Sequence, residues 1–259
     1  MGILQSNGPE KKHENDLCFW GSRFDCMNDA YDSQYALQLP MKIFNHYHPN
    51  EKIPRTIFPY VVSFCKKKDY LNMWRLYSSY IYLKLDKNQI EKSISLNNKY
   101  LLHDCVYPPK DKISAILESL TKILNTDDLN NEVCLQQIQC ASAFIKHYSF
   151  QVEEECRLVY FCSGQVPEVQ QELKLFKKDV CIDNTKDICF RTENNRLIPY
   201  HKFYLPKTAL KGIIVREYDD EAFERVKEHI CLVLHKVGIT NLDKKIEKSG
   251  AEKIIETKK

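Results

Sequence analysis

The sequence predicts an α+β protein built on a single mixed β-sheet packed with helices. The first part of the 259-residue chain alternates strand-like runs with helical patterns, and the later part places several strand-like runs in succession before a closing helix. Regular alternation throughout would favour a doubly wound parallel sheet, so this order favours the α+β class. The hydrophobic fraction of 43% and the charged fraction of 28% are typical of a globular chain.

The strands are predicted from short apolar runs that are rich in β-branched and aromatic residues. The clearest runs are LCFW, YVVSFC, YIYLKL and GIIV, and two consecutive prolines end the run that begins at Tyr100. The predicted strands cover residues 17–20, 60–65, 80–85, 100–107, 150–161, 186–192, 199–205 and 212–215.

The helices are predicted where apolar residues recur every three or four positions. Asp86 is expected to cap one of them and Asp219 or Asp220 the last, because an aspartate side chain accepts hydrogen bonds from the first free amides of a helix. Gly238 is expected to end the last helix. The predicted helices cover residues 70–80, 86–95, 111–124, 132–148 and 219–237, with a further helix near 30–38.

The chain is predicted to hold one domain, since no stretch rich in Gly, Ser and Pro separates two cores. Residues 1–16 are expected to form a flexible arm, residues 17–240 the domain, and residues 241–259 a charged tail that adds a turn or helix. No apolar run approaches the roughly 18 to 20 residues that span a bilayer, and no signal-peptide core is present. We therefore expect a cytoplasmic protein without a membrane partner.

Charge, cysteine and histidine patterns give no strong signal for several classes of function. The net charge of +3 is too small to indicate nucleic-acid binding by itself. The eleven cysteines include no C-x-x-C pair and are expected to be reduced. His46 and His48 have no third metal ligand nearby, so no metal site is predicted.

The main candidate site is the run FQVEEECRLVYF at residues 150–161. Side chains alternate between the two faces of a strand, so Glu153, Glu155 and Arg157 are expected to share one face, with the two glutamates roughly 7 Å apart. Two carboxylates this close could form an acid–base pair, because one raises the pKa of the other. The structural alternative is a buried ion-pair network in which Arg157 pairs with Glu155, or with Asp29 or Asp32 of an N-D-x-x-D turn.

Four motifs occur in order along the chain: FWGSRFDCMNDAYD, VVSFCKKKDYLNMWRLYSSYIYLKL, FIKHYSFQVEEECRLVYF and LIPYHKFYLPKTALKGIIV. In this order and spacing they resemble the bacterial family catalogued as domain of unknown function 2971, over about residues 17–240. The chain departs from the family pattern at Ala30, where the family has proline, and it lacks the glycine that usually follows the second motif. Only a polar arm precedes Leu17, so the family's upstream strand is missing, displaced or degenerate here. The resemblance implies the position of a site but no established reaction. The matching positions are Asn28, Asp29, Asp32, Ser63, Phe64, Trp74, Tyr77, Lys146, Phe150, Glu153, Glu155, Arg157, Leu205 and Pro206.

Three features are together similar to the arrangement of ADP-ribosyltransferases, which use NAD. These features are the strand with the E-x-E motif, a serine on an earlier strand, and an arginine near the first strand. This similarity implies an ADP-ribosyltransferase-like fold in which Glu155 stabilises the ribose cation and binds its 2′-hydroxyl, while Glu153 orients the acceptor. Ser63 would support the nicotinamide site. Trp74 or Tyr77 would stack on a ring of the substrate, and Arg23 would bind phosphate. These side chains are expected to converge in one cleft, with Lys146 upstream: Asn28, Asp29, Ser63, Trp74, Glu153, Glu155 and Arg157.

Two other classes of function stay open. In the first, Asp29, Asp32, Glu153 and Glu155 supply oxygen ligands to Mg²⁺ and the lysines at 66–68 bind phosphate, as in a protein that binds or processes nucleotides or nucleic acid. In the second, the chain is a non-enzymatic interaction module in bacterial stress response or phage defence. NAD, Mg²⁺ and oligonucleotides should each raise the melting temperature only if they bind the folded chain.

Overall fold

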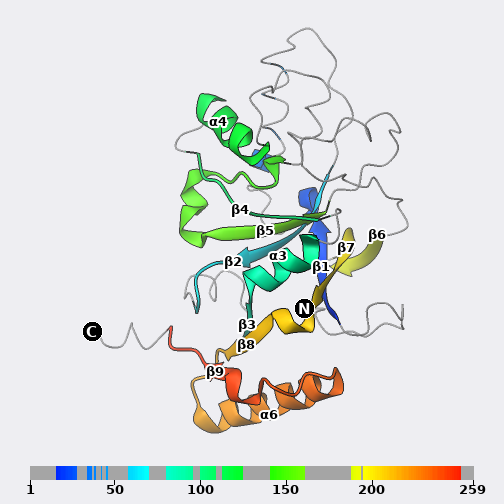
Figure 1. Ribbon diagram of the computed structural model, residues 1–259, viewed down its shortest axis with the longest axis vertical. Coiled ribbons are helices and arrows are strands. Elements are labelled where there is room, and N and C mark those ends of the chain that lie inside the picture. The colour runs from blue at the N-terminus through cyan, green and yellow to red at the C-terminus, as the bar shows by residue number, and fades with distance from the viewer. Residues whose placement is uncertain are drawn as a thin grey trace, which may run out of the picture. The chain divides into compact units, whose positions relative to one another are not determined.

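Figure 1 shows the computed structural model of the chain. It describes residues 16–27, 34–36, 58–69, 80–95, 100–108, 113–124, 141–160, 188–193 and 195–251, and the single positions 38, 42 and 45. Contacts divide the chain into two compact units, chiefly Cys18–Lys66 with Ile94–Phe203, and Lys67–Ser93 with Tyr204–Lys259. Each unit combines strands with helices, which confirms the α+β class, and the described strands form two sheets where a single sheet was expected.

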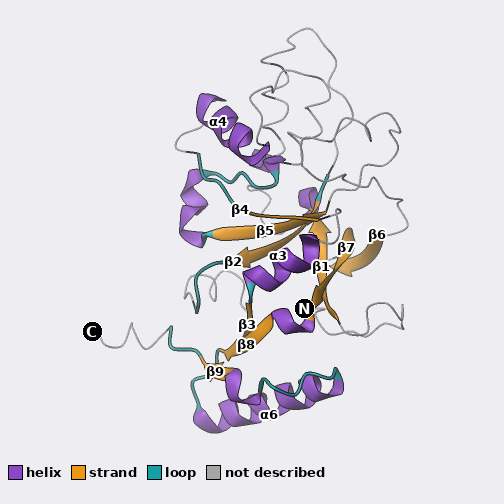
Figure 2. Ribbon diagram, viewed as in Figure 1, coloured by secondary structure: helices purple, strands orange, loops and turns teal. Residues whose placement is uncertain are grey.

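The first unit holds the strands β1 (Asp16–Arg23), β2 (Tyr60–Cys65), β4 (Tyr100–Asp104), β5 (Glu155–Tyr160), β6 (Ile188–Glu193) and β7 (Arg196–Pro206), the helix α4 (Ile113–Leu124), and the 3-10 helices η2 (Phe24–Cys26) and η3 (Tyr148–Glu153). The six strands form one sheet in the order β4-β5-β2-β1-β7-β6 (Figure 2). β5 pairs antiparallel with β2 on one side and with β4 on the other. Both edges of β5 are therefore paired, and because all six of its side chains are buried, both of its faces are covered as well.

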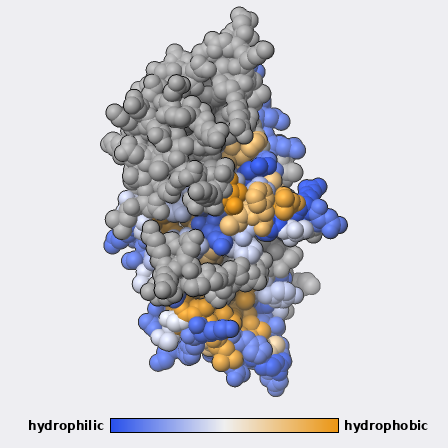
Figure 3. Space-filling model, turned by 90° about the vertical axis from the view of Figure 1, so that its right-hand side faces the viewer, coloured by the Kyte–Doolittle hydropathy of each residue, from blue (hydrophilic) through white to orange (hydrophobic). Residues whose placement is uncertain are grey.

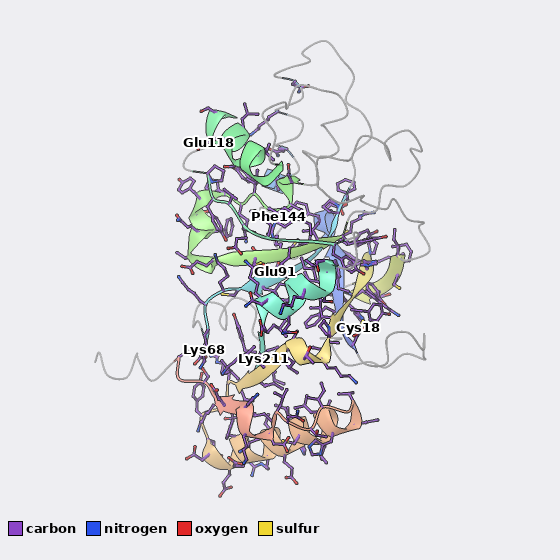
Figure 4. The ribbon with its side chains drawn as sticks, viewed as in Figure 1. Cys18, Lys68, Glu91, Glu118, Phe144 and Lys211 are labelled. Carbon is purple, nitrogen blue, oxygen red and sulfur yellow. The ribbon has the colours of Figure 1, made fainter. Side chains whose placement is uncertain are left out.

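One face of this sheet packs against the segment just before η3. Phe24, Val61, Phe144 and Val159 belong to one hydrophobic cluster, and Figure 4 shows Phe144 beside the strands of the sheet. The amide of Val106 donates to the carbonyl of Phe144, and the amide of Lys146 donates to the carbonyl of Val106. These contacts fix residues 144–146 over the sheet and therefore determine where the Lys146 side chain begins.

The opposite face carries closely packed aromatic rings. The ring of His201 stacks on Tyr160 with centroids 3.8 Å apart, and its Nε2 lies 3.2 Å from the hydroxyl of Tyr100. Phe203 packs against the same group and lies directly over Gly21, where an added Cβ would approach its ring to 2.1 Å. Glycine at position 21 is therefore required by the close approach of this ring.

The second unit holds the strands β3 (Ile81–Leu85), β8 (Leu210–Val215) and β9 (Ile246–Lys248), the helices α3 (Lys87–Ser95) and α6 (Asp220–Lys236), and the 3-10 helices η7 (Lys207–Ala209) and η8 (Asp243–Lys245). β8 is the central strand of its sheet, antiparallel to β3 and parallel to β9. Both aspartate caps are confirmed, because Asp86 accepts from the amides of Asn88 and Gln89, and Asp219 accepts from Ala222.

The β6–β7 hairpin exposes two large apolar side chains. Phe190 and Leu197 are 61% and 67% exposed, and the register pairs Phe190 with Pro199 and Thr192 with Leu197, so Phe190 and Leu197 share one face. Figure 3 shows the molecule from the right-hand side of Figure 1, the side on which β6 lies, and apolar side chains (orange) are visible on this surface. Single exposed apolar side chains are normal on a folded chain, so they indicate no function by themselves.

Several predicted elements need correction. The strand predicted at 150–161 begins only at Glu155, because residues 148–153 form η3. The helix predicted at 132–148 ends early, since residues 143 and 144 form a turn and residue 145 a β-bridge. The tail predicted as a turn or helix contains β9 in addition to the short η8. Of the helix predicted at 70–80, residues 70–79 lie outside the described residues.

Candidate functional site

Four charged side chains meet inside the first unit: Lys146, Glu153, Glu155 and Arg157, called the charged cluster below. The Nζ atom of Lys146 lies 2.8 Å from Oε2 of Glu153 and 2.7 Å from Oε2 of Glu155. The four side chains expose 8% or less of their surface. Buried charges require partners, and this cluster combines two positive with two negative groups.

Arg157 extends from the middle of β5 and is fully buried. Its Nε lies 2.9 Å from Oε1 of Glu155 and its Nη2 lies 3.2 Å from Oε2, which is the bidentate geometry that a guanidinium forms with a carboxylate. Its Nη1 donates to the carbonyl of Ala143, and its Cζ lies 5.4 Å from the centre of the Phe24 ring. Arg157 therefore links β5 to the segment above the sheet and to η2.

The prediction that Glu153 and Glu155 share one strand face was wrong in its geometry. Glu153 ends η3, and Glu154 takes the left-handed conformation with φ of +44°, its amide donating to the carbonyl of Gln151. β5 starts at the next residue. This bend, and not the alternation of a strand, directs both carboxylates toward Lys146.

The electrostatic surroundings keep Glu155 ionised. Burial raises the pKa of Glu155, but the charges of Arg157 and Lys146, together with their hydrogen bonds, lower it to about 2. The amide of Glu155 donates to the hydroxyl of Tyr107, and burial raises the pKa of that hydroxyl above its usual range. Tyr107 was not singled out by the sequence, because nothing in its local pattern shows which backbone amide it contacts.

The strand register places Ser63 and His103 beside Arg157. Both are directly opposite Arg157, Ser63 on β2 and His103 on β4, so their side chains lie on the same face of the sheet. Ser63 is exposed and His103 is half-buried. Of the predicted catalytic groups, Ser63 is therefore the accessible one, whereas the glutamates and Arg157 are covered.

Arg23 lies at the end of β1 and is already paired. Its Nε and Nη2 donate to the two oxygens of Asp25 at 2.6 and 2.9 Å, and its Cζ lies 5.3 Å from the centre of the Phe58 ring. A phosphate at Arg23 would have to compete with this carboxylate. Lys66 is likewise paired, with its Nζ 2.9 Å from Oδ2 of Asp104.

The remaining predicted site residues cannot be placed in this geometry. Asn28, Asp29, Asp32, Trp74 and Tyr77 lie outside the described residues. Their convergence with the charged cluster therefore stays a prediction.

A comparison with protein families gives a match over the part of the chain that contains the charged cluster. A family model described as a protein of unknown function, DUF2971, matches residues 73–158. Residues 73–158 belong to the DUF2971 family. The DUF2971 match contains the whole charged cluster, whereas Arg23 and Ser63 precede it. No curated protein and no solved structure matches the chain.

The described residues contain no group of three His, Cys, Asp or Glu side chains placed to hold a metal ion. In the same part of the chain, no helix combines the length and apolar composition needed to cross a membrane.

The chemistry of the charged cluster fits NAD poorly. A carboxylate that binds a ribose hydroxyl must be reachable, but Glu155 is 4% exposed, with one oxygen held by Arg157 and the other shared by Arg157 and Lys146.

Proposed function

We propose that the charged cluster is a structural ion-pair network and that this DUF2971 protein acts as a non-enzymatic interaction module. The observation that carries the proposal is the state of Glu155, which is buried and bound through both oxygens. A general base works best when its pKa is near the working pH. A pKa of about 2 leaves Glu155 ionised but a weak base, so the cluster suits the orientation of β5 better than proton transfer.

The cluster connects three parts of the first unit. Lys146 comes from the segment over the sheet, Glu153 from η3, and Glu155 and Arg157 from β5. Removing one partner of such a network is strongly destabilising, because another charge is then left buried and unpaired. A network of this kind gives one defined arrangement of the strand and the segment above it, which a binding surface requires.

Ligand-dependent stability tests this proposal against the enzymatic and nucleotide-binding classes. The melting temperature of the full chain is measured alone and with NAD, Mg²⁺ or oligonucleotides, and its oligomeric state is measured by light scattering. If the chain is a non-enzymatic interaction module, we expect a defined oligomeric state and a melting temperature that none of these ligands raises. A concentration-dependent rise with any one of them contradicts the proposal, because a ligand that binds the folded state raises its stability.

The second candidate is the NAD-using ADP-ribosyltransferase-like enzyme. It is favoured by one observation: Ser63 is exposed on the strand next to Arg157, where that hypothesis needs an accessible serine. The test is NAD cleavage by the wild type, Ser63→Ala and Glu155→Gln, each checked for folding by circular dichroism. Cleavage that both substitutions abolish in folded protein would support the enzyme, and no cleavage by the wild type would remove it.

A further inference from the structure

One edge of β6 has no neighbour among the strands that the structure describes. β6 ends the strand order of the six-stranded sheet, and Figure 1 shows it on the outer side of β7. Its register with β7 runs from Ile188 to Glu193 without a shift, so no bulge distorts this strand. An edge of this kind presents a row of N–H and C=O groups that can pair with another strand.

The backbone groups of Phe190 and Thr192 point to this open edge. Glu193 and Arg196 lie directly opposite each other with two residues between them, and the closing pair of such a hairpin is hydrogen-bonded. Because hydrogen-bonded and non-hydrogen-bonded pairs alternate along an antiparallel ladder, Thr192 and Phe190 belong to non-hydrogen-bonded pairs. Pro199 lies opposite Phe190 and has no N–H, which agrees with this alternation. In the described part of the chain, no hydrogen bond to a segment outside the hairpin involves Phe190 or Thr192.

The charged side chains of β6 do not block the edge. Nη2 of Arg191 donates to the hydroxyl of Ser22 on β1 at 2.9 Å, so the guanidinium reaches back over β7, away from the edge. Glu193 accepts from the same guanidinium at 3.1 and 3.2 Å. Proteins commonly protect an edge strand with lysine, proline or other charged side chains. β6 contains neither lysine nor proline, and its two charges are paired with each other.

We propose that β6 binds a second copy of this chain, with the two β6 strands antiparallel and Phe190 on the two-fold axis. The outward backbone groups of both strands then meet, and Ile188 lies opposite Thr192 of the partner subunit. This register overlaps residues 188–192 completely and forms about six hydrogen bonds. It also places the ring of Phe190, which is 61% exposed, against the same ring of the partner subunit, and cross-strand aromatic pairs are stabilising. Leu197, 67% exposed on the same face of the hairpin, extends the apolar contact.

A second copy suits this edge better than a charged partner does. Arg191, Glu193 and Arg196 form no patch of one sign that would select an acidic or a basic peptide. An apolar side chain that faces its own copy across a two-fold axis needs no complementary charge. β6 contributes no residue to the charged cluster, so the dimer does not depend on the role proposed for that cluster.

Light scattering of the full chain over a dilution series tests the dimer. The wild type should dimerise, and Phe190→Lys and Phe190→Glu should each raise the dissociation constant at least about tenfold, because like charges would face each other on the axis. An equimolar mixture of the two variants should restore dimers, since opposite charges then meet. Position 190 is exposed in the single chain, so circular dichroism should show the wild-type fold in both variants.

A backbone variant and an exposed apolar control complete the test. Thr192→Pro removes an N–H that points to the open edge and should weaken the dimer, whereas Thr192→Val keeps the N–H and should not. Leu232→Ala removes a side chain on α6 that is 63% exposed, and it should leave the dimer unchanged.

Three results would overturn the proposed dimer: a wild type that stays monomeric up to about 100 μM, a Phe190→Lys variant that dimerises like the wild type, or an equimolar mixture that stays monomeric. None of these results changes the melting temperatures measured with NAD, Mg²⁺ or oligonucleotides. The dimer and the interaction module can therefore fail separately.

Discussion

Replacing Glu155 by glutamine tests the energetic role of the charged cluster. The substitution keeps the size of the side chain but removes its charge and puts an amide NH₂ group in place of one oxygen. Each oxygen of Glu155 accepts from Arg157, and one also accepts from Lys146, so the new donor must face another donor. The remaining charges of the cluster would no longer balance.

The size of the effect follows from the pKa of Glu155. The folded-state pKa of about 2 lies below the ordinary value of 4.5, and this difference of about 2.5 units corresponds to roughly 3 kcal/mol that the ionised form contributes to stability. Because the folded-state pKa is lowered, the contribution is present above about pH 4.5 and is lost as the pH falls toward 2. We therefore expect Glu155→Gln to lower the free energy of unfolding at pH 7 by about 3 kcal/mol.

Urea unfolding at several pH values measures this effect, with Glu247→Gln as the matched control. Glu247 also binds two lysines, but its side chain is 45% exposed, so its loss should lower the free energy of unfolding by less than about 1 kcal/mol. Between pH 4.5 and 2 the wild type should lose stability more steeply than Glu155→Gln. Equal losses for the two variants at pH 7, or equal pH slopes for the wild type and Glu155→Gln, would refute the assignment of Glu155 to a buried ion-pair network.

Substitutions at four other positions test further features of the fold. Lys146→Met removes the cation that two buried glutamates share and should lower the free energy of unfolding by about 3–5 kcal/mol in the same urea assay. Glu154→Gly should be more stable than Glu154→Ala by about 1 kcal/mol in thermal unfolding, because glycine adopts the positive φ without a steric penalty. Gly21→Ala forces a Cβ against Phe203 and should lose about 1–3 kcal/mol, whereas Gly250→Ala, where the nearest atom is 3.8 Å away, should be nearly neutral in thermal unfolding.

Much of the fold could be predicted because its signals are local. The β-branched run of β2 matches the observed strand, and the aspartate caps of α3 and α6 follow from short-range side-chain chemistry. Gly238 ends the last helix with a φ of +76°, a conformation that glycine adopts readily. Such features depend on a few neighbouring residues, so a single sequence contains the information that specifies them.

The geometry of the candidate site could not be predicted in the same way. Residue types and spacing identified Glu153, Glu155 and Arg157, and the family resemblance added Lys146. The extended conformation assumed for residues 150–154 was incorrect. Glutamate has no particular preference for positive φ, so nothing local indicates the bend at Glu154. The bend is favoured by contacts distant in sequence, such as the bond from the amide of Lys66 to the carbonyl of Glu154.

The C-terminal strand shows the same limit at the level of a whole element. The segment around β9 is rich in lysine and glutamate, and such composition usually indicates a solvated tail or helix. Ile246 is nevertheless buried, and the register pairs it with Ile213 of β8, while Glu247 and Lys248 find opposite charges on neighbouring elements. A three-residue strand has too few positions to show a period of two, so its partners decide its structure. For the same reason, the hydrogen bond from the hydroxyl of Ser249 to Oδ1 of Asp69 becomes visible only when residues 69 and 249 are seen together.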